Sequence, residues 1–341
     1  MARVIRWFVV LVVLGAAGWS GWWYLGAQGQ EAGVAAWLEN QRKRGWQADT
    51  GDIDVQGFPM DFRMAVTDLA IGNPRQGWTW TAPILKAASR SYEPTRIVVT
   101  WPDNQSFAGK GDVAHVRSAL AETVLDLRPG PSMELRQAAT RIETLRIEAQ
   151  RGGKSGADSV SVDLKERDVD LSPPNSYELD VQALKVLLPK FLVEKIDPTG
   201  WLKPKIDKVT IRAHGAFEEA LGRKTVEKGD VALTAATISE ASFEWGPMRL
   251  ALSGEFTVNA QGYPEGTIAV EAREWRQMVR LAVSAGAIDK GTGDTVIKAI
   301  EFVNALAGGR EELRAPFQLK GGKIRLGPFA IADAPRLAER R

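Results

Sequence analysis

The sequence predicts a mainly β protein of the α+β class, an antiparallel sheet with a few flanking helices, preceded by one transmembrane helix. After residue 50, apolar and polar residues alternate over many short segments bounded by Gly, Pro, Asn or Asp, which is typical of half-buried antiparallel strands. Helical spacing is confined to a few segments. One uncharged apolar run, Trp7 to Ala27, is long enough to cross the ~30 Å hydrocarbon layer as a helix.

The apolar run 7–27 favours an uncleaved signal-anchor over a cleaved signal peptide. It exceeds the roughly 7–15 apolar residues of a signal peptide, and Leu25-Gly26-Ala27 matches a small-x-small cleavage site poorly. Aromatic side chains with a polar edge prefer the headgroup level of a membrane. The aromatic residues predicted to lie at the membrane interface are Trp19, Trp22, Trp23 and Tyr24.

The orientation follows from the flanking charges. Arg3 and Arg6 favour a cytoplasmic amino terminus, whereas the basic residues 42–44 oppose it. Long domains translocate largely regardless of such charges. We therefore expect residues 1–6 to be a cytoplasmic stub and the body to lie on the opposite side of the membrane.

Residues 28–45 are expected to form an amphipathic connecting helix. Val34, Trp37, Leu38 and Gln41 recur at helical spacing. This stripe can lie on the lipid headgroups or pack against the end of the following domain, and the sequence leaves both open.

The body is predicted to be one β domain over residues 46–335. Ile53 and Val55 alternate with polar residues, and a turn at Gly57-Phe58-Pro59 leads into a second alternating segment. Further strands are expected at 62–66, 145–149, 160–164, 209–213, 248–252, 256–260, 268–270 and 317–319. Turns are expected at 72–74, 151–153, 172–175, 262–266 and 321–322.

A helix pair is expected at 273–307, followed after the β domain by a basic tail at 336–341. Trp275, Met278, Val279 and Ala282 form one stripe. The second stripe consists of Val296, Ala299, Ile300 and Val303, with Asp294 predicted as its N-cap. A shorter helix over 187–196 is expected to end at Asp197-Pro198.

The predicted strands share one apolar face, which must be covered. The amphipathic helices are too few to cover it, so the alternatives are a closed sandwich or a curved, partly open groove. Both have the same sequence pattern. The residues predicted to line a groove are Ile53, Val55, Phe62, Met64, Val66, Val209, Ile211, Met248, Leu250 and Leu252.

Composition argues against several classes of function. The net charge is +2, from 44 basic and 42 acidic residues, which gives no electrostatic case for nucleic-acid binding. The absence of cysteine excludes disulfides, thiolate metal sites and cysteine nucleophiles. With only His115 and His214 and no metal-type spacing, we expect no metal, no cofactor and no enzymatic activity.

The remaining polar motifs favour structural roles. Gly153-Lys154-Ser155 lacks the earlier glycine and the strand–loop–helix setting of a phosphate loop, so it is interpreted as a hairpin. The carboxylate pairs Asp52/Asp54 and Asp168/Asp170 have the spacing of a solvated strand face. Aromatic residues Trp78, Trp80 and Trp101 are more typical of core packing than of a lipid groove.

In order and spacing, several motifs resemble the domain of unknown function 2125 family of Gram-negative envelope proteins, itself similar to the AsmA-like superfamily. The resemblance rests on Gly57-Phe58-Pro59 with Arg63, Ala82-Pro83, Tyr92-Glu93-Pro94, Gly262 to Gly266, the helix pair, and Leu319 to Pro328. Together these motifs span nearly the whole chain.

The resemblance implies an inner-membrane protein whose body lies in the periplasm as an elongated, curved, taco-like β-groove. It further implies a non-catalytic role in binding or transferring phospholipid for envelope lipid homeostasis. About 18 strands at ~4.8 Å each give on the order of 85 Å, shorter than the long relatives. A groove of this length implies either a local role or a partner, another envelope protein that extends the groove. The alternative is an envelope scaffold with a closed sandwich that binds another membrane protein.

Overall fold

The computed structural model describes residues 2–167, 173–228, 231–306 and 312–337. The chain divides into two compact units: residues 1–126 with 149–151 form unit 1, and residues 127–148 with 152–341 form unit 2. The predicted body of 46–335 therefore includes parts of both. Asp168 and Asp170 lie outside the described residues, as does the end of the predicted basic tail from residue 338.

Helix α1 (Ala2–Lys43) is one uninterrupted helix that includes both the predicted signal-anchor and the predicted connecting helix. Among the described residues, its stretch from Val10 to Lys43 is long and apolar enough to span a membrane, a test that a signal sequence also passes. The distal stripe packs on the sheet, since Leu38 is buried in a cluster with Ala48, Val66 and Leu69.

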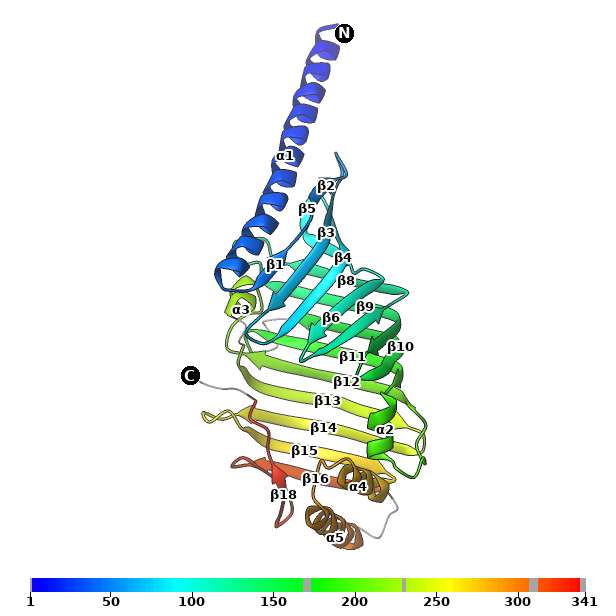
Figure 1. The fold of residues 1–341 in the computed structure, drawn as a ribbon. Coiled ribbons are helices and arrows are strands. Elements are labelled where there is room, and N and C mark those ends of the chain that lie inside the picture. Colours follow the sequence, from blue (N-terminus) through cyan, green and yellow to red (C-terminus); the bar gives the residue numbers. More distant parts are fainter. Residues whose placement is uncertain (1, 168–172, 229–230, 307–311, 338–341) are drawn as a thin grey trace. The chain divides into compact units, whose positions relative to one another are not determined.

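Unit 1 places α1 against a set of antiparallel strands (Figure 1). The central strand β3 pairs with β1, β2 and β4, and β4 pairs in turn with β5 and β6. The strands are β1 (Gln47–Asp49), β2 (Ile53–Gln56), β3 (Asp61–Asn73), β4 (Trp78–Arg90), β5 (Glu93–Thr100), β6 (Asn104–Gly109), β7 (Asp112–Arg117) and β8 (Leu120–Leu127).

Unit 2 is a meander in which each strand pairs with the next one along the chain. Its first strands are β9 (Leu135–Ala149), β10 (Gly153–Glu166), β11 (Ser176–Leu187), β12 (Lys205–Phe217) and β13 (Leu233–Trp245). They are followed by β14 (Met248–Val258), β15 (Pro264–Arg273), β16 (Leu313–Lys320), β17 (Lys323–Leu326) and β18 (Phe329–Asp333). The predicted fold class, mainly β with a large antiparallel sheet, a few helices and an apolar N-terminal helix, is confirmed.

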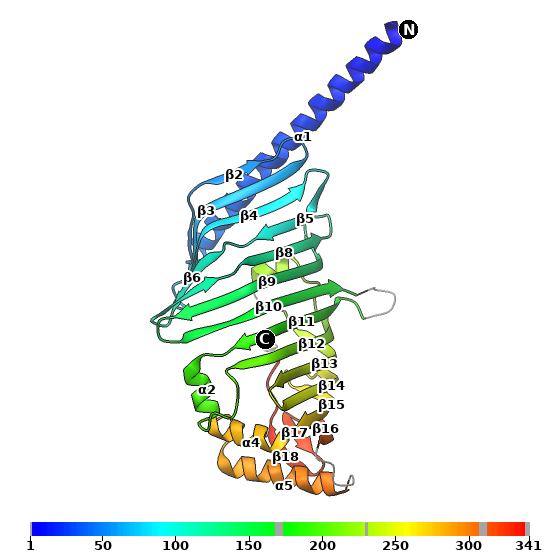
Figure 2. The ribbon, with the colours of Figure 1, turned by 90° about the vertical axis from the view of Figure 1, so that its right-hand side faces the viewer.

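Within the described residues, four further helices accompany these strands: α2 (Lys190–Ile196), α3 (Arg223–Lys228), α4 (Trp275–Ser284) and α5 (Lys290–Leu306). Figure 2 shows α4 and α5 side by side. They pack closely because Gly293 has no side chain: a Cβ there would lie 2.6 Å from Cγ2 of Val283. The predicted helix pair therefore forms, and its two helices contact each other.

The prediction of Asp294 as an N-cap is wrong. Helix α5 already begins at Lys290, so Asp294 lies inside it. The capping residue is Asp289, whose carboxylate accepts hydrogen bonds from the backbone N–H of Thr292 at 3.0 Å and from its hydroxyl at 2.5 Å. These bonds hold the pKa of Asp289 below its usual value. The cap satisfies an otherwise orphaned donor of the first turn, and the helix then continues through Gly291 and Gly293.

Asp197 ends α2, as predicted, and also holds the following loop. Its carboxylate is buried and accepts hydrogen bonds from the Thr199 hydroxyl at 2.5 Å, the Thr199 N–H at 3.2 Å and the Leu202 N–H at 2.6 Å. Desolvation raises the pKa of Asp197, but the hydrogen bonds from Thr199 and Leu202 outweigh it, and the net pKa is lowered. The carboxylate is therefore a structural anchor held in its charged form.

Candidate functional site: the apolar face of unit 2

The strand register of unit 2 aligns apolar side chains into continuous rows. Val181 lies opposite Val162 on one side and Ile211 on the other. Directly paired residues of antiparallel strands point to the same face. The row through Val181 continues over seven strands: Val162, Val181, Ile211, Ala241, Leu252, Val270 and Ala315. With six steps of about 4.8 Å it is roughly 29 Å long.

Parallel rows broaden this surface, which we call the apolar face. One neighbouring row consists of Val160, Ala183, Val209, Phe243, Leu250, Ala272 and Leu313. The other consists of Leu164, Leu179, Ala213, Ile238, Gly254, Ile268 and Phe317. At about 3.4 Å per residue, three rows span roughly 14 Å along the strands.

The opposite face of the same strands is polar. Arg212, next to Ile211, forms ion pairs with Asp180 at 3.2 Å and Glu240 at 2.7 Å. Arg314, next to Ala315, lies 3.8 Å from Glu271. Exposed pairs of this kind contribute little stability. They show that this face of the strands is exposed to solvent, whereas the other face makes the apolar contacts.

Among the described residues, helices α4 and α5 cover the end of the apolar face at β15–β17. Leu250 and Phe317 pack against the buried cluster formed by α4, α5 and strands β15–β17. Met248 is buried in a second cluster with Trp245, Leu202 and Leu281. The middle of the face belongs to none of the four buried clusters of the described residues: Val162, Val181, Val209, Ile211, Ala241 and Leu252 are half-buried.

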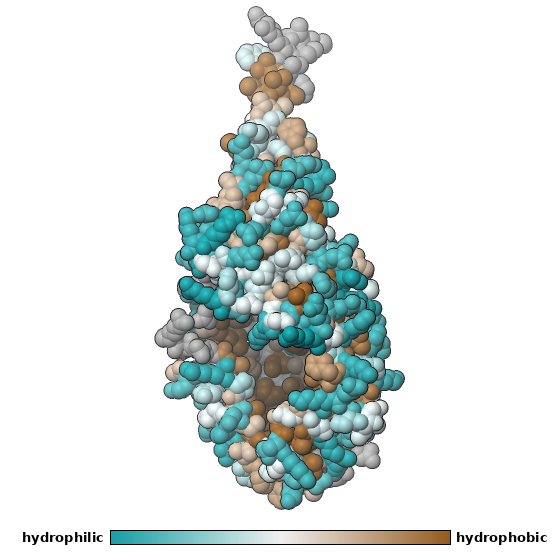
Figure 3. Space-filling model, in the orientation of Figure 1, coloured by the Kyte–Doolittle hydropathy of each residue, from teal (hydrophilic) through white to brown (hydrophobic). Residues whose placement is uncertain are grey.

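The space-filling view agrees with an incompletely covered face. Figure 3 shows a hollow with a brown, hydrophobic floor at the height of β11–β13. Val181 of β11 and Ile211 of β12 are directly paired, and both are half-buried. We call the half-buried middle of the apolar face, over β10–β14, the uncovered stretch.

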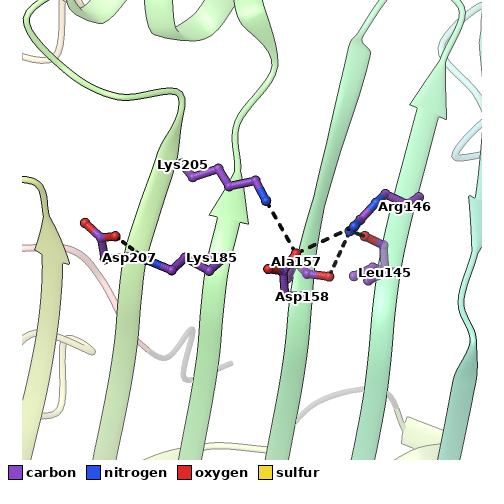
Figure 4. Close-up of polar contacts among 7 residues, drawn as sticks. All are labelled: Leu145, Arg146, Ala157, Asp158, Lys185, Lys205 and Asp207. Atoms are coloured by element: carbon purple, nitrogen blue, oxygen red, sulfur yellow. Dashed lines mark hydrogen bonds and ion pairs between the residues drawn. The ribbon is translucent and has the colours of Figure 1, made fainter.

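A row of charges crosses β9–β12 near one end of these strands (Figure 4). Arg146 lies 3.6 Å from Asp158, Lys205 lies 3.5 Å from Asp158, and Lys185 hydrogen-bonds Asp207 at 2.6 Å. The Lys185–Asp207 bond raises the pKa of Lys185 and lowers that of Asp207. These charged pairs form a polar rim on the sheet.

The predicted groove-lining residues fall into three environments. Those of β2 and β3 are covered by α1: Val55 and Phe62 pack with Ala27, and Ile53, Met64 and Val66 pack with Leu38. Met248 and Leu250 pack with the helix-covered clusters. Val209, Ile211 and Leu252 lie on the uncovered stretch. The structure thus brings together only the last group on an uncovered part of the sheet, and a lipid-lining role stays a prediction for all ten.

Three of the four predicted membrane-interface residues bind the backbone of unit 1. The indole N–H groups donate to backbone carbonyls: Trp19 to Pro59 at 2.9 Å, Trp22 to Ser91 at 3.1 Å and Trp23 to Asp61 at 2.7 Å. The exposed Tyr24 accepts a hydrogen bond from Gln28 at 2.9 Å. A single sequence contains no signal for such long-range contacts. Their role at a membrane interface stays a prediction.

Unit 1 also contains a hollow of about 450 Å³, lined by polar and apolar residues, that sequence reasoning missed. Ser106 and His115 are paired across β6 and β7 and hydrogen-bond at 3.1 Å between Oγ and Nδ1. Nucleophilic serine chemistry needs a carboxylate or similar group that orients the histidine. Among the described residues no carboxylate hydrogen-bonds the His115 ring, so the pair is read as a cross-strand contact.

The other polar candidates have structural partners. Lys154 pairs with Glu148 at 3.3 Å across the hairpin at Gly153. Asp54 accepts a hydrogen bond from Gln56 at 2.6 Å, and Asp52 and Asp54 are both exposed. Burial, followed by the charge of Arg167, lowers the pKa of His214. The residues that the structure describes contain no group of three His, Asp or Glu able to hold a metal.

Of the predicted aromatic core residues, Trp80 packs against the cluster around Leu38 and Val66 and contacts Trp101 at 6.0 Å between ring centroids. Trp78 contacts Trp46 at 5.5 Å. These rings therefore fill unit 1 rather than line the uncovered stretch of unit 2.

These features define a class: a β-sheet protein with a membrane-length apolar helix and a broad apolar sheet face. Within that class, the chain belongs to the DUF2125 family, because residues 22–335 match the model of this family, described as an uncharacterized protein conserved in bacteria. The match begins at Trp22 and so includes the part of α1 that packs on the sheet. No curated protein and no solved structure matches the chain.

Proposed function

We propose that the protein is anchored in the inner membrane by α1 and binds or transfers phospholipid, with its body in the periplasm. The observation that carries the proposal is the uncovered stretch, whose central row crosses β10–β14 in four steps of about 4.8 Å and is roughly 19 Å long. An acyl chain occupies about half of the ~30 Å hydrocarbon layer, so one chain fits within this row. Each buried CH₂ would contribute about 0.8 kcal/mol.

The chemistry of the surface supports binding without catalysis. Apolar rows bind acyl chains only through the burial of apolar surface area, and they offer no hydrogen bonds that select a headgroup. The charges of the rim are already paired with one another. The resemblance to AsmA-like proteins also supports a role in envelope lipid homeostasis, and another envelope protein that extends the apolar surface would be its partner.

Three substitutions on one strand test this proposal. Leu250→Asp places a charge in the helix-covered cluster, Leu252→Asp places it on the uncovered stretch, and Ser253→Asp places it on the exposed polar face. We expect Leu250→Asp to unfold unit 2, because an unpaired buried charge costs several kcal/mol. Leu252→Asp should stay folded but lose bound lipid, and Ser253→Asp should behave like the wild type.

The measurement is mass spectrometry of lipid that copurifies with the full chain in mild detergent, with circular dichroism as the check of folding. Lipid around α1 is common to all variants, so Ser253→Asp sets the baseline. Equal lipid in the Leu252→Asp and Ser253→Asp proteins would contradict the proposal. Unfolding of Leu252→Asp to the same extent as Leu250→Asp would instead favour a closed core, as expected for the scaffold alternative.

A further inference from the structure

We propose that two loop tips of unit 1 are immersed in the half of the bilayer that faces the sheet, beside α1. The tips are the β2–β3 loop at Gly57–Met60 and the β4–β5 turn at Ser91–Tyr92. The inference rests on the proposed function in one respect, the crossing of the membrane by α1. The partner of this surface is the acyl-chain region of a phospholipid bilayer.

The first step is the attachment of both tips to α1. Indole hydrogen bonds join Trp19 to Pro59 and Trp22 to Ser91. The ring of Trp23 also contacts the ring of Phe58 at 5.5 Å between centroids. Figure 2 shows α1 passing the ends of β2 and β3. The tips therefore lie at the level of residues 19–23 of the helix.

The second step is depth along the helix. Residues 7–18 rise about 18 Å at 1.5 Å per residue, and this is the part of the apolar run before the first contact with the loops at Trp19. A hydrocarbon layer of ~30 Å needs about 12 Å more, which is supplied by residues 19–26. A shift of the helix that moved the tips out of the bilayer would draw Arg3 and Arg6 into the hydrocarbon layer. Their charges oppose this shift because they prefer the opposite headgroups.

The third step is the surface of the tips. Their large side chains are apolar and point to solvent: Phe58 is 56%, Met60 53% and Tyr92 62% exposed. The β3–β4 turn at the other end of β3 differs, since its residues Pro74, Arg75 and Gln76 include no large apolar side chain. The apolar tips thus continue the apolar surface of α1 at the same level.

The fourth step is the backbone, because an unsatisfied backbone group in hydrocarbon costs several kcal/mol. Pro59 O accepts from the Trp19 indole at 2.9 Å and from the Ser91 hydroxyl at 3.0 Å. Met60 O accepts from the Ser91 N–H at 2.9 Å and its hydroxyl at 3.0 Å. The fully buried Ser91 therefore joins the two tips and satisfies carbonyls that water would otherwise hydrate.

One ion pair lies near the tips. Asp61, at the start of β3, forms a 2.7 Å ion pair with Arg90, at the end of β4. Its backbone N–H donates to Gly57 O at 2.9 Å. This pair is expected to lie at the headgroups, directly beside the immersed tips.

The test uses single cysteines, since the chain contains none. Leu11→Cys, Phe58→Cys and Arg75→Cys would each carry a small environment-sensitive fluorophore on the full chain, reconstituted into phosphatidylcholine vesicles with or without acyl-brominated phosphatidylcholine as quencher. Tyr92→Cys is a second tip site, and circular dichroism checks the folding of each variant. Leu11 is 66% exposed on α1 and reports the membrane span itself.

We expect strong quenching at Leu11 and at the tip sites, at least half as strong at the tips as at Leu11, and none at Arg75. Quenching at Leu11 with tip signals equal to that of Arg75 would overturn the inference and leave the anchor intact. No quenching at Leu11 would overturn the membrane anchor and this inference together. Equal quenching at Arg75 and Phe58 would also contradict immersion limited to the tips.

Discussion

Asp197 shows how a single residue can anchor an irregular segment. Its buried carboxylate accepts hydrogen bonds from the backbone N–H groups of Thr199 and Leu202, and Leu202 is itself part of a buried cluster. A carboxylate that accepts several hydrogen bonds is stabilised in its charged form. The loop after α2 therefore depends on one ionised side chain.

We predict that Asp197→Asn lowers the free energy of unfolding by about 1–3 kcal/mol, because a buried amide offers one acceptor fewer and adds donors. Thermal unfolding of the full chain in mild detergent measures this. The control is Glu194→Gln, an exposed residue of α2 in an i,i+4 pair with Lys190, which should change the stability by less than about 0.5 kcal/mol. Equal effects of both would contradict the anchor role.

The lowered pKa of Asp197 also gives a pH dependence. Because the folded-state pKa of Asp197 lies below its ordinary value, the contribution of this carboxylate to stability is complete above that ordinary value and is lost as the pH falls through the folded-state pKa. The wild type should therefore lose more stability than Asp197→Asn between pH 5 and pH 2. Parallel acid-unfolding curves of the two proteins would contradict this assignment.

At the scale of elements, the packing of α1 on β3 depends on Gly26. A Cβ at Gly26 would lie 2.6 Å from Cζ of Phe62, whereas a Cβ at Gly29 would meet nothing within 4 Å. Phe62 is 2% exposed and stacks on Trp23 with centroids 5.8 Å apart. The missing side chain thus allows the close approach of helix and sheet.

We predict that Gly26→Leu separates α1 from β3 and lowers the stability of unit 1 by about 1–3 kcal/mol, the usual effect of overpacking. Gly29→Leu is the control, and it should be neutral or slightly stabilising because leucine is the better helix former. Limited proteolysis of the β2–β3 loop, which we expect to be faster only in Gly26→Leu, checks this. Identical cleavage rates would show that α1 does not depend on Gly26 for its position.

At the scale of the whole molecule, α1 is both a membrane-length helix and part of a core. Its proximal residues Val10–Leu14 are exposed, whereas Ala27 and Leu38 are buried against Phe62 and Ala48. The two portions therefore have separable roles.

Two deletions test this separation. A chain lacking residues 1–18 should fold and not aggregate, since it retains the docked part of α1. A chain lacking residues 1–45 exposes Phe62 and Val66, each worth about 1.5–3 kcal/mol when buried, and should aggregate. Size-exclusion chromatography and thermal unfolding compare them, and equal behaviour of the two proteins would contradict a structural role for the distal half of α1.

Alternation and helical spacing predicted most elements. The period of two in segments such as 160–164 and 209–213 became β10 and β12, and Trp275–Ala282 became most of α4. Helix limits were less predictable. Asp294 was predicted to begin α5, because Gly291 and Gly293 are residues that usually interrupt a helix. In the structure Asp289 caps the helix, and Gly293 lies inside it where it packs closely on Val283.

The candidate site could be predicted only in part. Periodicity identified Ile211, Leu252 and Phe62 as apolar-facing, since alternation is a local property of the strand. It did not distinguish Phe62, covered by α1, from Ile211 on the uncovered stretch. What covers a side chain depends on contacts between residues distant in the sequence.

The sequence by itself determined the class of fold, the membrane-length helix and the polar and apolar faces of the strands, because each follows from the local order of apolar residues. Only the tertiary structure decided that Trp19, Trp22 and Trp23 bind backbone carbonyls of unit 1, that Gly26 leaves room for Phe62, and that the helices cover one end of the apolar face. The physical reason is that register and helix docking bring together groups whose spacing along the chain carries no signal of their contact.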